Sequence, residues 1–175
     1  MNNDLKATIG ALVARWRREG LPSHDALAAE ADALATLAGE PGTAPLWRTP
    51  PLLLTATLDD ALGQGLAVIH RFADAVGLRR SHLGLTVSAE AVIDACRAAK
   101  PALLGMTVLQ FDSEEDLALI RREIPTDTRM VLGGPLFKAD PELAERCGVD
   151  FVAGHVGDFL QYLLDHREAL DVLPG

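Results

Sequence analysis

The sequence predicts an α/β fold: a doubly wound, five-stranded parallel sheet of the flavodoxin or Rossmann-like type, with an N-terminal helical hairpin. From residue 51 onward, short apolar runs alternate with amphipathic helical stretches, which is typical of parallel strands covered by helices on both faces. Apolar residues make up 49% of the chain and aromatic residues 5%, so the core must be aliphatic. A length of 175 residues suits one domain with an appendage.

Residues 1–49 are expected to form the hairpin and a linker. The first helix is predicted over residues 4–19, where apolar side chains recur at helical spacing before a Gly-Leu-Pro stop. The second is opened by Ser23 or His24 and runs to Gly39, and a Pro/Gly-rich linker follows. Because so short a segment cannot build a large core, we expect it to pack on the rest of the chain or on a partner.

The α/β unit is expected to span residues 50–175. Its strands are predicted at residues 52–57, 82–87, 102–109, 129–132 and 151–153. Its helices are predicted at about residues 60–76, 88–99, 113–123, 141–146 and 156–168. Right-handed crossovers then give a doubly wound sheet, which binds ligands at the carboxyl ends of its strands. The loops at that edge are 56–63, 107–113, 133–140 and 153–157.

Composition excludes several classes of partner. Sixteen basic against 25 acidic residues give a net charge of −9, which argues against binding to nucleic acid or to an anionic membrane. Cys96 and Cys147 make no disulfide framework and lack the spacing of a metal site. No signal-peptide pattern opens the chain, and no apolar run approaches the roughly 20 residues of a membrane span. We therefore expect a cytoplasmic protein.

The strand-end segments carry a family resemblance. They are His82–Ile93, Gly105–Leu109, Val131–Phe137, Pro141–Ala144 and Cys147–Asp150. In this order and spacing they resemble the cobalamin-binding domains of corrinoid proteins, over about residues 51–168. The resemblance implies a fold of the cobalamin-binding type and a cobalamin or other corrinoid as cofactor.

The resemblance also implies a slot for the nucleotide tail of the cofactor, lined by a Ser/Thr-x-Leu and a Gly-Gly. The matching residues are Thr107, Leu109, Gly133 and Gly134. A threonine hydroxyl can bond a ring nitrogen or a ribose, and paired glycines let a flat heterocycle approach the backbone. The same residues are also common in ordinary turns. The remaining candidates of the later strand-end loops are Pro135, Phe137 and Gly154.

The first strand-end loop departs from the family pattern, Asp-x-His-x-x-Gly, whose histidine replaces the cofactor's own base on cobalt. Aligning on Gly63 puts Asp60 at the histidine position and Leu58 at the aspartate position, and aligning on Gly65 puts Leu62 at the histidine position. The departure puts His-ligated cobalamin in doubt. It leaves open cobalamin bound with its own base on cobalt, a tetrapyrrole ligated elsewhere, or a fold that has lost its cofactor.

Asp59 and Asp60 have two interpretations. Carboxylates at a helix start can cap it and complement its dipole, or they can contact a ligand. An acidic pair here is also typical of receiver domains, but Thr107 stands where those need a phosphoacceptor aspartate and Gly154–His155 where they need a lysine. Binding of FMN would bring a phosphate against two uncompensated carboxylates.

The histidines offer one candidate metal ligand. His155 follows the fifth strand at the ligand edge, so it could be an axial ligand, a proton donor or a helix cap, whereas His70 lies mid-helix and is expected to pack. Some sensory relatives are reported to hold haem, and the segments Gly133–Phe137 and Asp140–Ala144 resemble those sensory and regulatory members more than they resemble methyl carriers.

The leading hypothesis is a module that holds a corrinoid or related tetrapyrrole as a sensor, carrier or accessory subunit. No Ser/His/Asp arrangement can be justified from spacing, so a self-contained enzyme is disfavoured. A flat macrocycle needs two walls, and the short hairpin predicts that a partner protein or a homodimer supplies the second. The alternatives are a cofactor-free interaction or regulatory module, a haem-binding sensor, and an enzyme with Asp60 or His155 as base.

Overall fold

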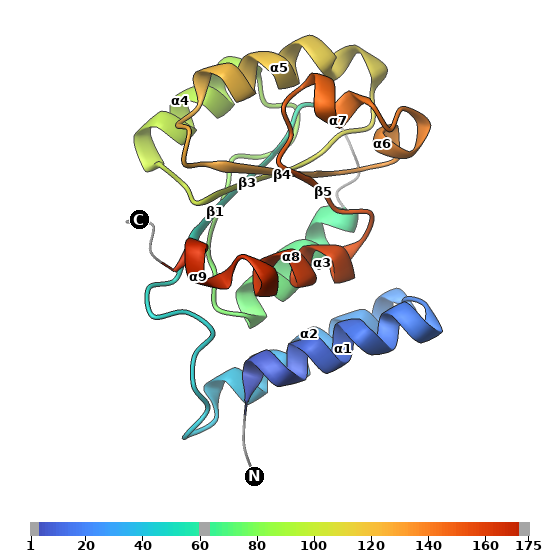
Figure 1. Ribbon diagram of the computed structural model, residues 1–175, viewed down its shortest axis with the longest axis vertical. Coiled ribbons are helices and arrows are strands. Elements are labelled where there is room, and N and C mark those ends of the chain that lie inside the picture. The colour runs from blue at the N-terminus through green and yellow to red at the C-terminus, as the bar shows by residue number, and fades with distance from the viewer. Residues whose placement is uncertain (1–3, 60–63, 172–175) are drawn as a thin grey trace.

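The computed structural model describes residues 4–59 and 64–171 and has four layers (Figure 1). The N-terminal hairpin lies on a layer of two helices, α3 and α8; the sheet follows, and α4 and α5 cover its other face. The five strands are parallel in the order β2-β1-β3-β4-β5, which is the flavodoxin-like order. The predicted fold class is confirmed.

The elements alternate along the chain as expected. The strands are β1 (Leu52–Thr57), β2 (Arg79–His82), β3 (Leu103–Thr107), β4 (Arg129–Gly133) and β5 (Phe151–Val152). The longer helices are α1 (Leu5–Glu19), α2 (His24–Gly39), α3 (Gln64–Ala75), α4 (Ala89–Ala99), α5 (Glu114–Glu123) and α8 (Val156–Asp165). The short ones are the 3₁₀ turn η1 (Phe111–Ser113), α6 (Leu136–Ala139), α7 (Leu143–Arg146) and α9 (Arg167–Leu170). None of the helices in the described part of the chain could cross a bilayer.

The hairpin shares its core with the α/β unit. Side chains of Asp4 and Ser23 cap α1 and α2 by accepting from backbone N–H groups. Helix α1 packs on α8 and α2 packs on α3. Buried Trp16 meets Phe72 of α3 edge to face, with ring centroids 5.5 Å apart, and its Nε1 donates to Glu30 at 2.9 Å. The hairpin is therefore one layer of the molecule. That residues 1–49 form a unit separate from the α/β unit stays a prediction.

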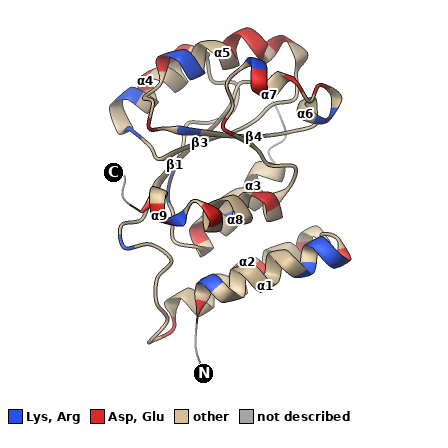
Figure 2. Cartoon of the chain, viewed as in Figure 1, with Lys and Arg blue, Asp and Glu red and all other residues tan. Residues whose placement is uncertain are grey.

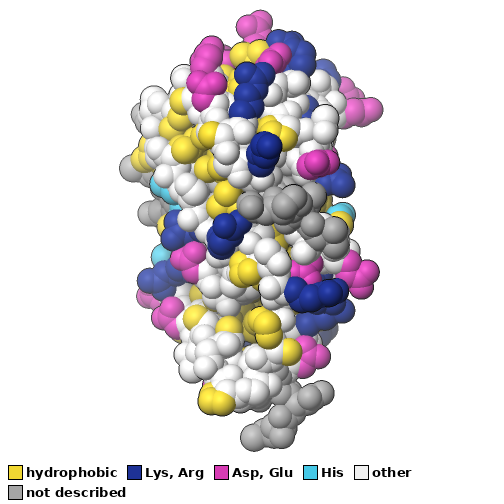
Figure 3. Space-filling model, turned by 90° about the vertical axis from the view of Figure 1, so that its left-hand side faces the viewer, with side chains coloured by type: hydrophobic (Ala, Val, Ile, Leu, Met, Phe, Trp, Pro, Cys, Tyr) yellow, Lys and Arg dark blue, Asp and Glu magenta, His cyan; other side chains and the backbone are white. Residues whose placement is uncertain are grey.

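Strand residues divide between the two faces of the sheet, and both cores are aliphatic. Leu53 and Leu103 pack toward α3 and α8, whereas Leu54 and Leu104 pack toward α4 and α5. Figure 2 shows that most charged residues lie on the outer helices and that the strands between these helices carry few of them. On the side of the molecule drawn in Figure 3, basic and acidic side chains are interspersed, so that side presents no extended basic patch.

The predicted position of the second strand, 82–87, is wrong. Alternating Leu83, Leu85 and Val87 mimic a strand, but Gly84 and Thr86 between them have φ of 121° and 54°, which ends extended structure. The real strand β2 is an exposed edge whose residues are all polar, so it carries no hydrophobic signal. Residues 83–87 form the loop leading to α4, and the backbone of this loop still bonds the end of β1, through Leu83 N to Thr55 O and Val87 N to Thr57 O.

A hydrogen-bonded group of four side chains holds the edge strand β2 to β1 and α3. Thr55 Oγ1 lies 2.8 Å from His70 Nε2 and 2.9 Å from His82 Nδ1, and Arg80 lies 3.5 Å from His70 Nδ1. These contacts are satisfied together when His70 Nδ1 accepts from Arg80, His70 Nε2 donates to Thr55, and Thr55 donates to His82. Burial, then Arg80 and His82, lower the pKa of His70 to about 4, while Asp74 opposes this shift.

The end of β4 requires glycine. Gly134 has a φ of 120°, and a Cβ there would overlap the carbonyl oxygen of Val108 and lie 3.0 Å from its nitrogen. The backbone of β3 meets β4 closely at this point, since Val108 N donates to Gly133 O at 2.9 Å. The second glycine of the Gly-Gly pair thus sets how near the two strand ends lie.

We expect stability to depend on pH through His70. The unfolded chain takes up a proton near pH 6.5 and the folded chain only near pH 4, so this contribution is complete above pH 6.5 and is lost as pH falls toward 4. His70→Gln removes the titration, and the wild type should lose more stability than this variant between pH 6.5 and 4.5 in urea unfolding. Exposed His24→Gln is the control and should follow the wild type. Parallel curves for wild type and His70→Gln would contradict the assignment.

We expect Gly134→Ala to lower the free energy of unfolding by about 3 kcal/mol, because the new methyl group meets backbone atoms in a strained conformation. Gly10→Ala is the matched control. Gly10 lies in α1 with nothing within 4 Å of an added Cβ, so the change should stabilise by about 0.5–1 kcal/mol. Chemical denaturation of both variants measures the contrast, and equal stabilities would disprove it.

Candidate functional site

A cavity of about 530 Å³ lies at the carboxyl ends of the strands, between the sheet and helices α3 and α8. We call it the strand-end cavity. Its lining from the strands and the loops that follow them includes Gly105, Thr107, Leu109, Gly133, Gly134, Pro135, Ala153, Gly154 and His155. Its lining from the helices includes Leu66, Val68, Ile69, Val156 and Phe159, and the hairpin adds Leu21 and Leu27. The volume is in the range of small-molecule and cofactor sites.

The cavity exists because two glycines stand where central strands would carry side chains. Gly105 of β3 lies in register between Thr55 and Val131, and a Cβ there would approach Leu53 Cδ1 to 3.3 Å. Gly133 is the register partner of Thr107. Both glycines face α3 and α8 and line the cavity, and an added Cβ at Gly133 would lie 3.0 Å from the carbonyl oxygen of Ala153, so the close approach of the β5 end also favours glycine there.

The lining is mostly apolar, with few polar groups. Thr107 contributes a half-buried hydroxyl, and Lys138 and His155 are the ionisable side chains among the described lining residues. No aspartate or glutamate lines the cavity within the described residues. Convergence of a few polar groups on apolar walls is typical of a cofactor pocket.

Thr57, at the end of β1, holds a buried polar atom near the site. It pairs in register with Thr107, it is fully buried, and its hydroxyl has no hydrogen-bond partner within the described parts of the chain. An unsatisfied buried hydroxyl costs stability unless something else bonds it. Thr57 is not among the described residues that line the cavity, and Thr43 holds a second buried hydroxyl without a partner, so this atom does not by itself mark a ligand site.

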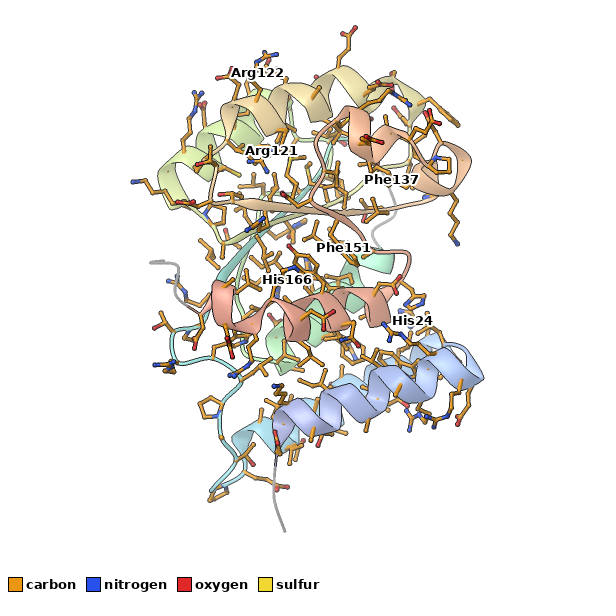
Figure 4. The ribbon with its side chains drawn as sticks, viewed as in Figure 1. His24, Arg121, Arg122, Phe137, Phe151 and His166 are labelled. Carbon is orange, nitrogen blue, oxygen red and sulfur yellow. The ribbon has the colours of Figure 1, made fainter. Side chains whose placement is uncertain are left out.

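Most of the candidate residues from the later strand-end loops meet at the cavity. Thr107, Leu109, Gly133, Gly134, Pro135, Gly154 and His155 all line it. Phe137 does not: it is buried in the cluster against α4 and α5, on the opposite side of the sheet from Phe151 (Figure 4).

The first strand-end loop is only partly described. Asp59 is 5% exposed, and its carboxylate accepts from the backbone N–H of Leu109 at 2.9 Å. It therefore ties the end of β1 to the end of β3, instead of lining the cavity. Asp60 and Gly63 lie outside the described residues.

His155 caps helix α8. Its Nδ1 accepts from the N–H groups of Gly157 and Asp158, at 3.1 and 3.3 Å. A neutral imidazole whose Nδ1 accepts carries its proton on Nε2, and this atom lies 3.9 Å from Asp158 Oδ1. Metal ligation through Nε2 would require that proton to leave. Within the two described stretches, no group of three or more metal-ligating side chains could hold an ion.

Sequence reasoning missed three parts of the site. Gly105 was noted only as part of the third strand, although a glycine within an apolar strand is itself a signal of close approach. Leu21 reaches the cavity from the hairpin turn and Leu27 from α2, and nothing local in the sequence indicates that. Lys138 had no assigned role.

Comparison with known proteins places these features in a family. Residues 52–163 match the model of the B12 binding domain. No curated protein sequence matches the chain.

Solved structures share the fold at low sequence identity. A novel cobalamin-binding protein from Desulfitobacterium hafniense DCB-2 is 16% identical, with a TM-score of 0.75 over 92% of this chain and 80% of that one. The monomethylamine corrinoid protein of Methanosarcina barkeri is 15% identical, with a TM-score of 0.60 over 92% and 79%. A pilus assembly-related protein from Burkholderia pseudomallei is 16% identical, with a TM-score of 0.53 over 71% and 94%. These likenesses concern the fold, but the family match extends over more than half of the sequence, and the chain belongs to the B12-binding domain family.

Proposed function

We propose that this protein is a corrinoid-binding module that takes the nucleotide tail of the cofactor into the strand-end cavity. The observation that supports this most is the cavity itself, floored by Gly105 and Gly133 in a member of the B12-binding family. When bound, a corrinoid supplies a cobalt ion able to carry an alkyl group. The chain supplies the binding, the orientation and the exclusion of water.

Each part of the cavity has a role in this proposal. Gly105 and Gly133 let a flat ring lie against the strands. The hydroxyl of Thr107 offers a hydrogen bond to a ring nitrogen or a ribose. Apolar walls from α3 and α8 keep water from the buried part of the ligand.

The first strand-end loop offers no imidazole to cobalt, because residues 57–65 contain no histidine. His155 is engaged as the cap of α8. With the tail inside the cavity, the cofactor's own base is also away from cobalt. A retained corrinoid should therefore absorb as the base-off form, without an imidazole ligand from this loop.

We expect purified protein incubated with hydroxocobalamin or adenosylcobalamin to keep a corrinoid absorption spectrum after desalting. Band positions report whether the cofactor's own base is on cobalt. A retained haem Soret band in a parallel sample would favour the haem sensor instead. Protein left colourless by both corrinoids and haem would contradict the proposal and favour the cofactor-free interaction module.

Filling the cavity should block the corrinoid. Val68 and Val149 are both half-buried valines packed against a core cluster, and only Val68 lines the cavity. We expect Val68→Trp to raise the corrinoid Kd at least about tenfold, because the indole takes the space of the tail. Val149→Trp should leave the Kd unchanged. Equal effects of the two substitutions on retained absorbance would disprove the location.

The role as a sensor, carrier or accessory subunit requires a second wall for the macrocycle. Leu21, Leu85, Leu109 and Phe111 are the large hydrophobic side chains that the structure exposes among the described residues. Leu85, Leu109 and Phe111 follow strand ends, and Leu21 stands at the hairpin turn. Phe111 is 72% exposed. A second copy of the chain or another protein is proposed to cover this apolar rim.

Light scattering of the corrinoid-loaded protein tests the second wall. We expect the mass of a dimer, and Phe111→Ser should return it to the mass of a monomer because it removes the most exposed apolar side chain of the rim. If the loaded protein is a monomer by itself but forms a complex of larger mass with another protein of its source, that partner provides the second wall. If it is a monomer and still retains the corrinoid through gel filtration without any other protein, no second wall is needed and this part of the proposal is contradicted.

A further inference from the structure

The charge lining the strand-end cavity is opposite to that of the whole protein. The chain carries a net charge of −9, yet within the described lining of the cavity there is no carboxylate, and Lys138 is the one side chain of permanent positive charge. Lys138 is exposed. A cation held at the opening of an apolar cavity favours an anionic group on whatever enters it.

The fold holds Lys138 in this place. Helix α6 follows the Gly134 turn, and Leu136 and Phe137 are buried in the core against α4 and α5. The backbone N–H of Lys138 donates to Pro135 O at 3.1 Å. The backbone that carries the lysine is therefore anchored on one side of the sheet, while the residue lines the cavity on the other.

Asp140, at the end of α6, and Glu114 are both paired with another residue. Arg146 donates to Asp140 at 2.6 and 3.3 Å and to Glu114 at 2.9 and 3.0 Å. The hydrogen bonds from Arg146 lower the pKa of both carboxyl groups, so both stay ionised and paired with it. No ion pair of Lys138 occurs with any residue in the described ranges.

On the fifth-strand side of the opening, the fold fixes the position of the Asp158 carboxylate. It accepts from Gly154 N at 2.9 Å, and its Oδ1 lies 3.9 Å from His155 Nε2. His155 in turn caps α8 with its other nitrogen. Lys138 therefore remains the group at the opening that is available to pair with a ligand.

We propose that Lys138 binds the phosphodiester of the nucleotide tail and makes the site selective for complete corrinoids over forms that lack the nucleotide. This rests on the corrinoid-binding function proposed above. The ligand has the matching chemistry, a flat base that enters the apolar cavity and an anionic phosphodiester between base and macrocycle. A charge-assisted contact at a partly exposed position changes affinity by about threefold to tenfold.

The test compares two probes that differ in the tail. Cobalamin and cobinamide, each with two cyanide ligands on cobalt in excess cyanide, share the macrocycle, and only cobalamin has the phosphodiester and base. Lys138→Met should weaken cobalamin binding about threefold to tenfold and leave cobinamide binding unchanged, and it should reduce the salt dependence of cobalamin binding. Lys138→Arg should retain the preference.

Lys6→Met is the matched control, because Lys6 is exposed on α1 and its loss changes the net charge equally. It should leave both affinities as in the wild type. The proposal for Lys138 is overturned if Lys138→Met leaves cobalamin binding unchanged or weakens both probes equally while the wild type binds them. If the wild type binds neither probe, the proposed corrinoid-binding function is contradicted, and so is the role of Lys138 that depends on it.

Discussion

The absence of side chains at Gly105 and Gly133 is the constraint on which the site depends. Both glycines lie in central strands and face α3 and α8, and an added Cβ would lie 3.3 Å from Leu53 Cδ1 at Gly105 and 3.0 Å from Ala153 O at Gly133. Packed interiors rarely keep such voids, because each lost contact costs stability. A void with a glycine floor at the ligand edge of a doubly wound sheet is therefore better explained by a ligand than by imperfect packing.

The hairpin helps to keep that void open. Trp16 of α1 contacts Phe72 of α3, and an added Cβ at Gly157 of α8 would lie 3.3 Å from its ring. One indole thus stands against both helices that cover the cavity and limits how far they can settle onto the sheet. Leu21 and Leu27 then extend the same segment to the opening. The N-terminal hairpin, which precedes the α/β unit in the sequence, therefore contributes side chains to the strand-end cavity.

The sequence predicts the order of the strands and helices better than it predicts which side chains line the site, and the reasons are physical. Periodicity located the central strands because their burial is continuous, and it failed at β2 because Arg79–His82 is a polar edge strand. Strand-end position brought Thr107 and Gly133 together correctly, since parallel strands end at one edge. It also included Phe137, whose side chain the turn into α6 directs to the other face. The direction in which a loop residue points depends on the turn, and strand order alone does not determine it.

The family pattern combines two features, a histidine in the first strand-end loop that binds cobalt and a slot for the nucleotide tail. The expected histidine of the first loop is missing from residues 57–65, and Asp59 of that loop is tied to Leu109 N. The strand-end cavity, in contrast, has glycines, the Thr107 hydroxyl and apolar walls at the positions that the resemblance assigns to the nucleotide tail. The corrinoid-binding function proposed above therefore depends on burial of the tail in this cavity and needs no imidazole from the first loop.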